Sequence, residues 1–220
     1  LQAYVDNAFK EKFFHLPLTE QPEYNGTQLI HSKVIASYLR QLLRNDLQYA
    51  PFRMEGMEQD VREMMEIDTP QGKLALQIGG TIDRLDSKGD TLRIVDYKTG
   101  GTPKTPENIE QLFTPADNRP NYIFQTFLYA AILCRKQSLK VAPSLLYIHR
   151  AASESYSPVI EMGAPRQPKV PVNNFAFFED EFRERLHGLL QEIFSQEETF
   201  SQTEDTRKCE YCDFRSLCKR

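Results

Sequence analysis

The chain has 220 residues and a mass of 25.5 kDa, which suits one domain of ordinary size with room for a small appendage. Its 40% hydrophobic and 26% charged residues exclude a disordered or fibrous protein. A net charge of -4 and a pI near 5.7 exclude a polycationic coat for nucleic acid. Nucleic acid would therefore have to be held by a local patch or through metal ions.

The sequence carries no signal for a membrane. No run reaches the roughly 18 apolar residues that a membrane helix needs, and residues 1–14 lack the basic start and apolar block of a signal peptide. We therefore expect a cytoplasmic protein without a membrane partner. Because the chain begins with Leu1 and not with Met, we also expect it to be a piece of a longer protein.

The first 57 residues are predicted to be helical. Residues 1–15 have loosely helical apolar spacing, residues 18–26 read as a linker, and residues 27–46 form a helix that ends before Pro51. The apolar stripe of this helix has i, i+4, i+5 spacing. It consists of Leu29, Ile30, Val34, Ile35, Tyr38, Leu39, Leu42 and Leu43.

Beyond residue 57 the spacing of the apolar residues changes from that of a helix to that of strands. Residues 61–67, 73–86 and 91–98 are predicted strands, and the tight connection at 87–90 makes the last two a hairpin.

The rest of the chain mixes helices with one more strand. We predict a polar loop over 100–120, a mostly buried helix over 121–137, a buried strand over 143–150, an irregular excursion over 153–172 and an amphipathic helix over 174–195. The fold class is therefore α/β (α+β), with a small, mainly antiparallel sheet flanked by helices.

Three charged residues on the predicted hairpin suggest chemistry. Asp96 and Lys98 share a strand face, and pairing across the turn brings Asp83 alongside them. Two converging carboxylates suit a hard cation such as Mg²⁺, and an ammonium beside them can orient a water for attack on phosphorus. The alternative is an ordinary solvated strand face, which the acid–lysine spacing alone would favour.

Three motifs together resemble the PD-(D/E)XK nucleases, and within them the RecB-like branch. They are residues 80–84 (GTIDR), residues 95–100 (VDYKTG) and residues 125–129 (QTFLY), in the order that the family shows. The resemblance covers roughly residues 58–150 and the C-terminal cysteines. It implies a core like that of restriction endonucleases.

The resemblance assigns roles to the hairpin residues. Asp83 and Asp96 match the metal-binding carboxylates, the carbonyl of Tyr97 would be a further ligand, and Lys98 matches the catalytic lysine.

Gln125 and Tyr129 match a pair that faces the active site and the substrate. They lie four residues apart and so share a helix face. The alternative is an ordinary half-buried helix face.

Other matches are looser. Arg84 either contacts phosphate or pairs with Asp86, and Glu58, placed just before the first strand, resembles an acidic position of some members. The branch's G-x-x-x-H helix is missing. Gly26 and His31 stand five apart, and we expect His31 to have a packing or surface role.

Three cysteines gather at the C-terminus. Cys209, Cys212 and Cys218 have the spacing C-x2-C-x5-C, which suits zinc or an iron–sulfur cluster but leaves a four-ligand site incomplete. The remaining cysteine, Cys134, is expected to be a small buried thiol. The triplet resembles that of iron–sulfur RecB-like nucleases, the AddB type among them, whose fourth cysteine precedes the nuclease core. We therefore expect a 4Fe–4S cluster in the full-length protein and an incomplete one here.

These observations favour a DNA nuclease that uses Mg²⁺ or Mn²⁺ and acts as an exonuclease coupled to a helicase in DNA recombination or repair. The predicted segments are a helical one (1–57), a nuclease core (58–200) and a cysteine tail (201–220). Two alternatives stay open: an inactive nuclease-like module that binds DNA or docks a protein, and a zinc knuckle in the tail that grips single strands.

Overall fold

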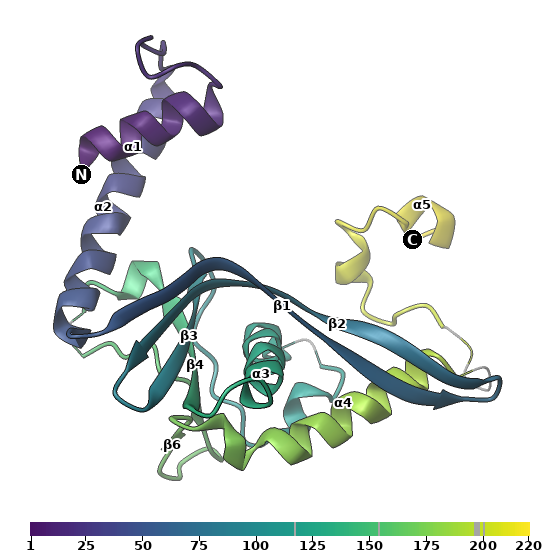
Figure 1. Cartoon of the computed structure of the whole chain (residues 1–220). Helices are drawn as coiled ribbons and strands as arrows, with labels where there is room; N and C mark the ends of the chain where they lie inside the picture. Colours follow the sequence, from purple (N-terminus) through teal and green to yellow (C-terminus); the bar gives the residue numbers. More distant parts are fainter. Residues whose placement is uncertain (117, 154, 196–198, 200) are drawn as a thin grey trace.

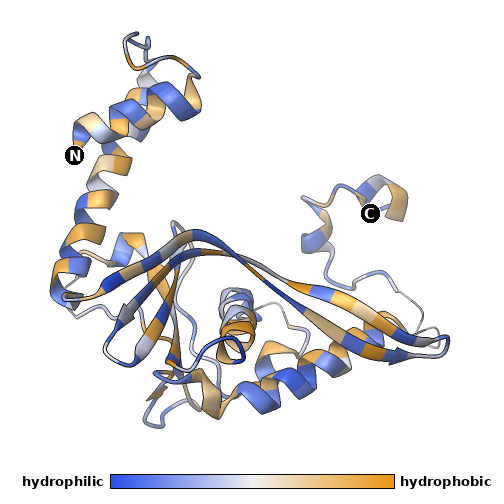
Figure 2. Cartoon of the chain, viewed as in Figure 1, coloured by the Kyte–Doolittle hydropathy of each residue, from blue (hydrophilic) through white to orange (hydrophobic). Residues whose placement is uncertain are grey.

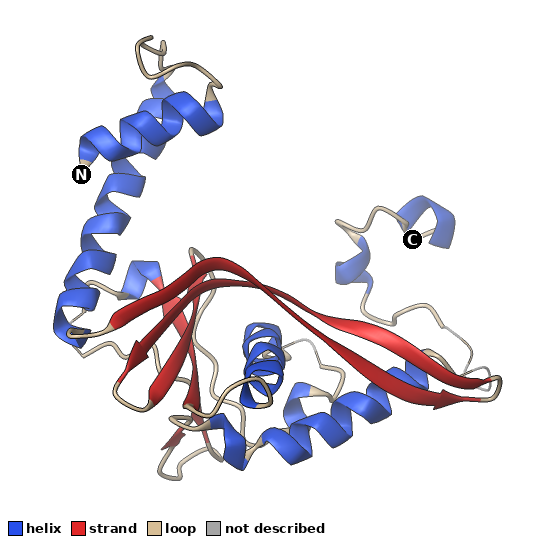
Figure 3. Cartoon of the chain, in the orientation of Figure 1, coloured by secondary structure: helices blue, strands red, loops and turns tan. Residues whose placement is uncertain are grey.

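A four-stranded sheet forms the centre of the molecule (Figures 1 and 3). The computed structural model describes residues 1–116, 118–153, 155–195, 199 and 201–220. The strands are β1 (Arg53–Thr69), β2 (Gly72–Lys88), β3 (Thr91–Lys98) and β4 (Lys140–Tyr147), in that order across the sheet. β1, β2 and β3 are antiparallel, whereas β4 runs parallel to β3. The predicted mixed α/β fold with a mainly antiparallel sheet is confirmed.

β1 and β2 form a hairpin that extends far beyond the other strands (Figure 1). β1 is longer than the predicted strand 61–67, because its first residues are mostly exposed on an edge strand and so carry little hydrophobic signal. The turn between β2 and β3 is also shorter than the predicted 87–90. It consists of Gly89 and Asp90, and Gly89 has the positive φ of 61° that such a tight turn requires.

Helix α3 (Asn121–Cys134) connects β3 to the parallel strand β4 and fills the core against the sheet. Its buried face includes Phe127 and Ile132, both with no exposed surface. β4 starts and ends three residues earlier than predicted, and residues 148–150 turn into a 3-10 helix, η3.

Helix α4 (Glu179–Ile193) lies along the outer half of the β1–β2 hairpin (Figure 1). Its residue Arg183 donates to both carboxylate oxygens of Glu63 on β1, at 2.7 and 2.8 Å. The predicted start at residue 174 was five residues early. A 3-10 helix, η4 (Phe175–Phe177), precedes α4 and buries Phe175 completely.

The N-terminal helices form an arm that projects from the sheet (Figure 1). α1 (Gln2–Ala8) and the π-helix η1 (Phe9–Phe13) fold back on the long helix α2 (Gly26–Tyr49). Asn25 begins α2 with a reciprocal capping box to Gln28.

The apolar stripe of α2 is largely exposed, and orange bands along the arm mark apolar residues (Figure 2). The stripe residues that are at least 40% exposed are Leu29, Ile30, Val34, Ile35 and Leu43, and Leu47, which lies beyond the stripe on the same helix, is exposed as well.

The remaining elements are short. They are η2 (Glu110–Leu112), β5 (Glu161–Met162), β6 (Val170–Pro171), η5 (Thr206–Cys209) and α5 (Arg215–Cys218). β1 spans residues 57 and 58, where one segment boundary was predicted. The division into three segments remains a prediction. Among the described residues, no helix is both long enough and apolar enough to cross a membrane.

Candidate active site

β2 and β3 stop pairing at the two predicted metal-binding aspartates. The ladder ends at the pair Arg84–Val95, so Asp83 and Asp96 hold the next position in the same register. There the backbone amide of Tyr97 donates a 2.8 Å hydrogen bond to Oδ2 of Asp83. A side-chain carboxylate thus replaces a backbone acceptor, and both aspartates stand at the mouth of the opened hairpin.

Lys98 lies directly beside Asp96. Its Nζ forms an ion pair with Oδ2 of Asp96, whose side chain is only 4% exposed. Burial raises the pKa of the Asp96 carboxyl and Asp83 raises it further, whereas Lys98 opposes both effects. The structure therefore brings together three residues that the sequence singled out.

Helix α3 adds a residue that the sequence analysis missed. Tyr122 places its ring centroid 4.3 Å from Nζ of Lys98, a cation–π distance. Tyr122 stands three residues before Gln125 and so shares a face of α3 with it. That spacing was a usable signal, because a helix face that reaches a site can contribute every third or fourth residue.

Gln125 and Tyr129 pack against β2 and contact each other. Gln125 donates to the Tyr129 hydroxyl at 2.9 Å, and Tyr129 is 4% exposed. The Tyr129 ring covers Gly80, where an added Cβ would lie 2.4 Å from its hydroxyl oxygen. Neither side chain hydrogen-bonds to Asp83 among the described residues. The predicted role of the pair at the substrate remains a prediction.

Glu58 lies within β1 and not before the first strand, as the sequence had suggested. The pairing on either side places Glu58 across from Asp83, but its φ of 48° interrupts the ladder and its side chain is exposed. Glu58 is therefore the nearest acidic residue on the neighbouring strand. His31 is exposed on α2, which fits the expected surface role.

Arg84 pairs with carboxylates and is 2% exposed, so the alternative of a phosphate contact is wrong. Its Nε donates to Asp86 at 2.9 Å, and its Nη1 donates to both oxygens of Asp46 at 2.9 and 2.8 Å. Nη1 also lies 3.2 Å from the Tyr97 hydroxyl. Arg84 thus joins the last turns of α2 to the sheet beside Tyr97.

The carboxylates fit a divalent cation. Oδ2 of Asp96 is buried and receives no hydrogen bond of good geometry from the described residues, only the ion pair with Lys98. Such an oxygen suits a cation that would complete its contacts. No group of three or more His, Cys, Asp or Glu in the described part of the chain could hold a metal by itself. Two carboxylates are nevertheless enough for Mg²⁺, which usually takes only one or two protein carboxylates and completes its coordination with waters and substrate phosphates.

The cysteines are placed as follows. Cys209 and Cys218 are half-buried and Cys212 is exposed, and none forms a disulfide among the described residues. Cys134 on α3 is half-buried, and burial raises the pKa of its thiol to about 11. The iron–sulfur cluster remains a prediction.

The comparison with known families agrees with this geometry. A family model of the PD-(D/E)XK nuclease superfamily matches residues 1–219. The chain belongs to this superfamily. No match is found among curated proteins. Membership of the PD-(D/E)XK superfamily implies a nuclease and hence a hydrolase that binds nucleic acid, usually with the help of divalent metal ions.

Proposed function

We propose that this PD-(D/E)XK protein is a metal-dependent DNA exonuclease of the RecB-like type, with Asp83 and Asp96 as metal ligands and Lys98 as the catalytic lysine. The single observation that carries the proposal is the opened end of the β2–β3 hairpin. There one ammonium and two carboxylates meet, and one carboxylate oxygen lacks a well-formed hydrogen bond.

The chemistry would follow from these positions. A Mg²⁺ or Mn²⁺ ion held by Asp83 and Asp96 would offset charge on the phosphate and make water more acidic. Lys98, steadied by Tyr122 and Asp96, would orient the attacking water in line with the leaving group. The water oxygen forms a bond to phosphorus and loses its proton, while the phosphorus–oxygen bond to the leaving nucleotide breaks and that oxygen takes up a proton.

The proposal is tested with linear DNA and Mg²⁺. We expect the wild type to release nucleotides and the variants Asp96→Ala and Lys98→Ala to release none. Asp90→Ala is the matched control, because Asp90 is an exposed carboxylate that pairs with Lys140 at 2.7 Å outside the site. Full activity in Asp96→Ala would contradict the assignment.

A helicase partner in DNA recombination or repair is part of the proposal. The exposed apolar stripe of α2 supports a protein partner, because a run of apolar side chains on a projecting arm favours association.

The same stripe also supports the alternative, an inactive module that docks a protein or DNA. Calorimetric titration with Mn²⁺ separates the two functions. Binding in the wild type that is lost in Asp83→Ala supports the nuclease, whereas no binding that depends on Asp83 supports the module.

For the cysteine tail we propose part of a 4Fe–4S site that is complete only in the full-length protein. Anaerobic purification should then give substoichiometric iron with this chain. A stoichiometric brown cluster would contradict incompleteness, and zinc in place of iron would support the zinc knuckle.

A further inference from the structure

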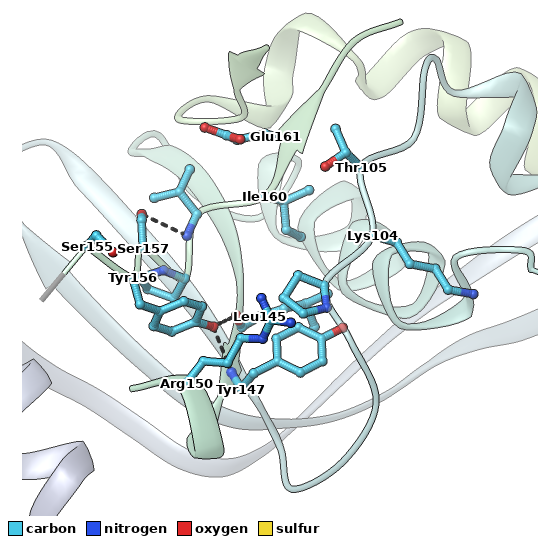
Figure 4. A pocket seen from close by; sticks show the side chains of 13 residues that line it. Lys104, Thr105, Leu145, Tyr147, Arg150, Ser155, Tyr156, Ser157, Ile160 and Glu161 are labelled. Carbon is cyan, nitrogen blue, oxygen red and sulfur yellow. Dashed lines mark hydrogen bonds between the residues drawn. The ribbon is translucent and has the colours of Figure 1, made fainter. Parts of the chain in front are cut away.

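A cavity of about 270 Å³ lies at the end of β4 (Figure 4). Its walls come from the end of β4, from the loop after Lys98 and from residues 155–161. The lining residues that matter here are Lys104, Tyr147, Arg150, Tyr156 and Glu161.

Two structural links place the cavity next to the candidate active site. Tyr147 lines the cavity and is the register partner of Lys98 across the parallel strands β3 and β4. An added Cβ at Gly101 would lie 3.5 Å from the ring of Tyr122 and 3.9 Å from the ring of Tyr147. The loop after Lys98 therefore runs past both the tyrosine that contacts the lysine and the tyrosine that lines the cavity.

One wall of the cavity is rigid. The Tyr156 hydroxyl donates to the carbonyl of Leu145 at 2.9 Å and accepts from the amide of Tyr147 at 2.8 Å. Both hydrogen bonds are drawn in Figure 4. Because its hydroxyl is engaged with the backbone of β4, Tyr156 forms a fixed surface, and the polar recognition must come from other side chains.

Arg150 supplies the free donors. It ends the 3-10 helix η3 that follows β4, and its guanidinium makes no hydrogen bond or ion pair with any residue that the structure describes, although its backbone carbonyl accepts from the amide of Ser153 at 3.0 Å. Lys104 is different, because its Nζ already donates to the carbonyls of Asn118 and Arg119 at 2.7 and 3.2 Å. In Figure 4 Arg150 lies close to Tyr147, whereas Glu161 lies well apart from it.

We propose that Arg150 binds a phosphate of the DNA strand next to the scissile phosphate and that the cavity receives the attached nucleotide. This inference rests on the proposed nuclease function. A guanidinium with free donors suits bidentate contact with phosphate. The volume is close to the lower end of the roughly 300–1,000 Å³ of ligand sites, so it fits one nucleotide of a single strand and not a duplex. The carboxylate of Glu161 disfavours a second phosphate at the other end.

The test measures binding of fluorescein-labelled oligothymidylate by fluorescence anisotropy, in Ca²⁺ and over a series of salt concentrations. We expect Arg150→Ala to weaken binding about 10-fold, as for loss of a hydrogen bond to a charged group. The slope of log K against log salt should fall by about 0.7, the value for one phosphate contact on a single strand. Arg150→Lys should keep the slope and lose part of the affinity, because it keeps the charge without the planar fork.

Arg40→Ala is the matched control, because Arg40 is an exposed arginine on α2 that does not line the cavity. Oligonucleotides with and without a 5′-phosphate distinguish a terminal phosphate from an internal one. Tighter binding of the oligonucleotide with the 5′-phosphate, or of the one without it, supports the inference if Arg150→Ala removes the difference. Equal affinity and slope in Arg150→Ala and Arg40→Ala would overturn the inference. The proposed function would still stand if Asp96→Ala abolishes cleavage, and it fails separately if the wild type does not cleave DNA.

Discussion

Replacing Gly80 with alanine tests whether the Tyr129 ring is fixed over β2. A Cβ at this position would lie 2.4, 2.8 and 3.0 Å from the hydroxyl oxygen, Cε1 and Cζ of Tyr129. Three contacts at or below 3.0 Å to one ring mean that the ring must move. Moving the Tyr129 ring into solvent would lose its buried packing and its hydrogen bond from Gln125, because the residue is only 4% exposed.

The expected cost follows from two opposing effects. Overpacking a core side chain costs about 1–3 kcal/mol. Gly80 has no positive φ, so alanine adopts its backbone without strain, and the smaller entropy of the unfolded chain returns about 0.4–1 kcal/mol. The net loss for Gly80→Ala is therefore about 1–2 kcal/mol, which lowers the Tm of a chain of this size by about 2–8 °C.

Urea unfolding of four proteins measures this coupling: the wild type, Gly80→Ala, Tyr129→Ala and the double variant. In the Tyr129→Ala background the ring is gone, so Gly80→Ala should cost nothing or stabilise slightly. Gly188→Ala is the control, because a Cβ at Gly188 on α4 meets nothing within 4 Å and should stabilise the helix by about 0.5–1 kcal/mol. An equal cost of Gly80→Ala in both backgrounds would refute the reasoning.

Three further predictions concern the charged groups. Tyr122→Ala should slow DNA cleavage about 2- to 5-fold in a gel assay, because an exposed cation–π contact contributes about 0.5–1 kcal/mol, whereas Tyr122→Phe should keep the rate. Asp86→Ala should lower the free energy of unfolding by about 3–5 kcal/mol in urea, because Asp86 has no exposed surface and its loss leaves buried Arg93 without a carboxylate partner. The hydrogen bond from Arg183 lowers the pKa of Glu63 from 4.5, although burial opposes it. The ion pair of Glu63 with Arg183 therefore stabilises the fold fully above pH 4.5, and this stabilisation is lost as the pH falls through the lowered pKa of Glu63. Urea midpoints from about pH 6 to about pH 3 should fall more steeply in the wild type than in Glu63→Gln, and parallel curves would contradict the sign.

The sequence predicted the fold best where burial imposes a period. β3 was predicted with its observed bounds, because its central residues are buried on both faces and are apolar before Asp96 except for Arg93. The length of β1 was underestimated, because an exposed edge strand can carry polar residues on both faces and then lacks the alternation of apolar residues that marks a strand. The start of α4 was misplaced because Phe175 continues the apolar pattern of a helix while belonging to a separate turn.

The candidate site was predictable from residues that stand together in sequence, and less so from contacts between elements. The proximity of Asp83, Asp96 and Lys98 could be predicted from the sequence, because the turn of a hairpin fixes the register of its two strands. The contact of Tyr122 with Lys98 depends on how α3 crosses the sheet, which no local pattern specifies. The partner of Arg84 on α2 was equally hidden, since Asp46 is 38 residues away along the chain.

That buried partnership connects the arm to the site. Asp46 in the last turns of α2 holds Arg84, and the same guanidinium nitrogen reaches the hydroxyl of Tyr97, whose backbone amide holds Asp83. A buried charge pair is costly to break when only one partner is removed. The base of the arm is therefore fixed to the strands that present the carboxylates, and a protein bound along the exposed stripe of α2 would be attached to the same rigid framework as Asp83 and Asp96. This arrangement fits the proposed helicase partner, because such a partner would be held in a fixed position relative to the two carboxylates.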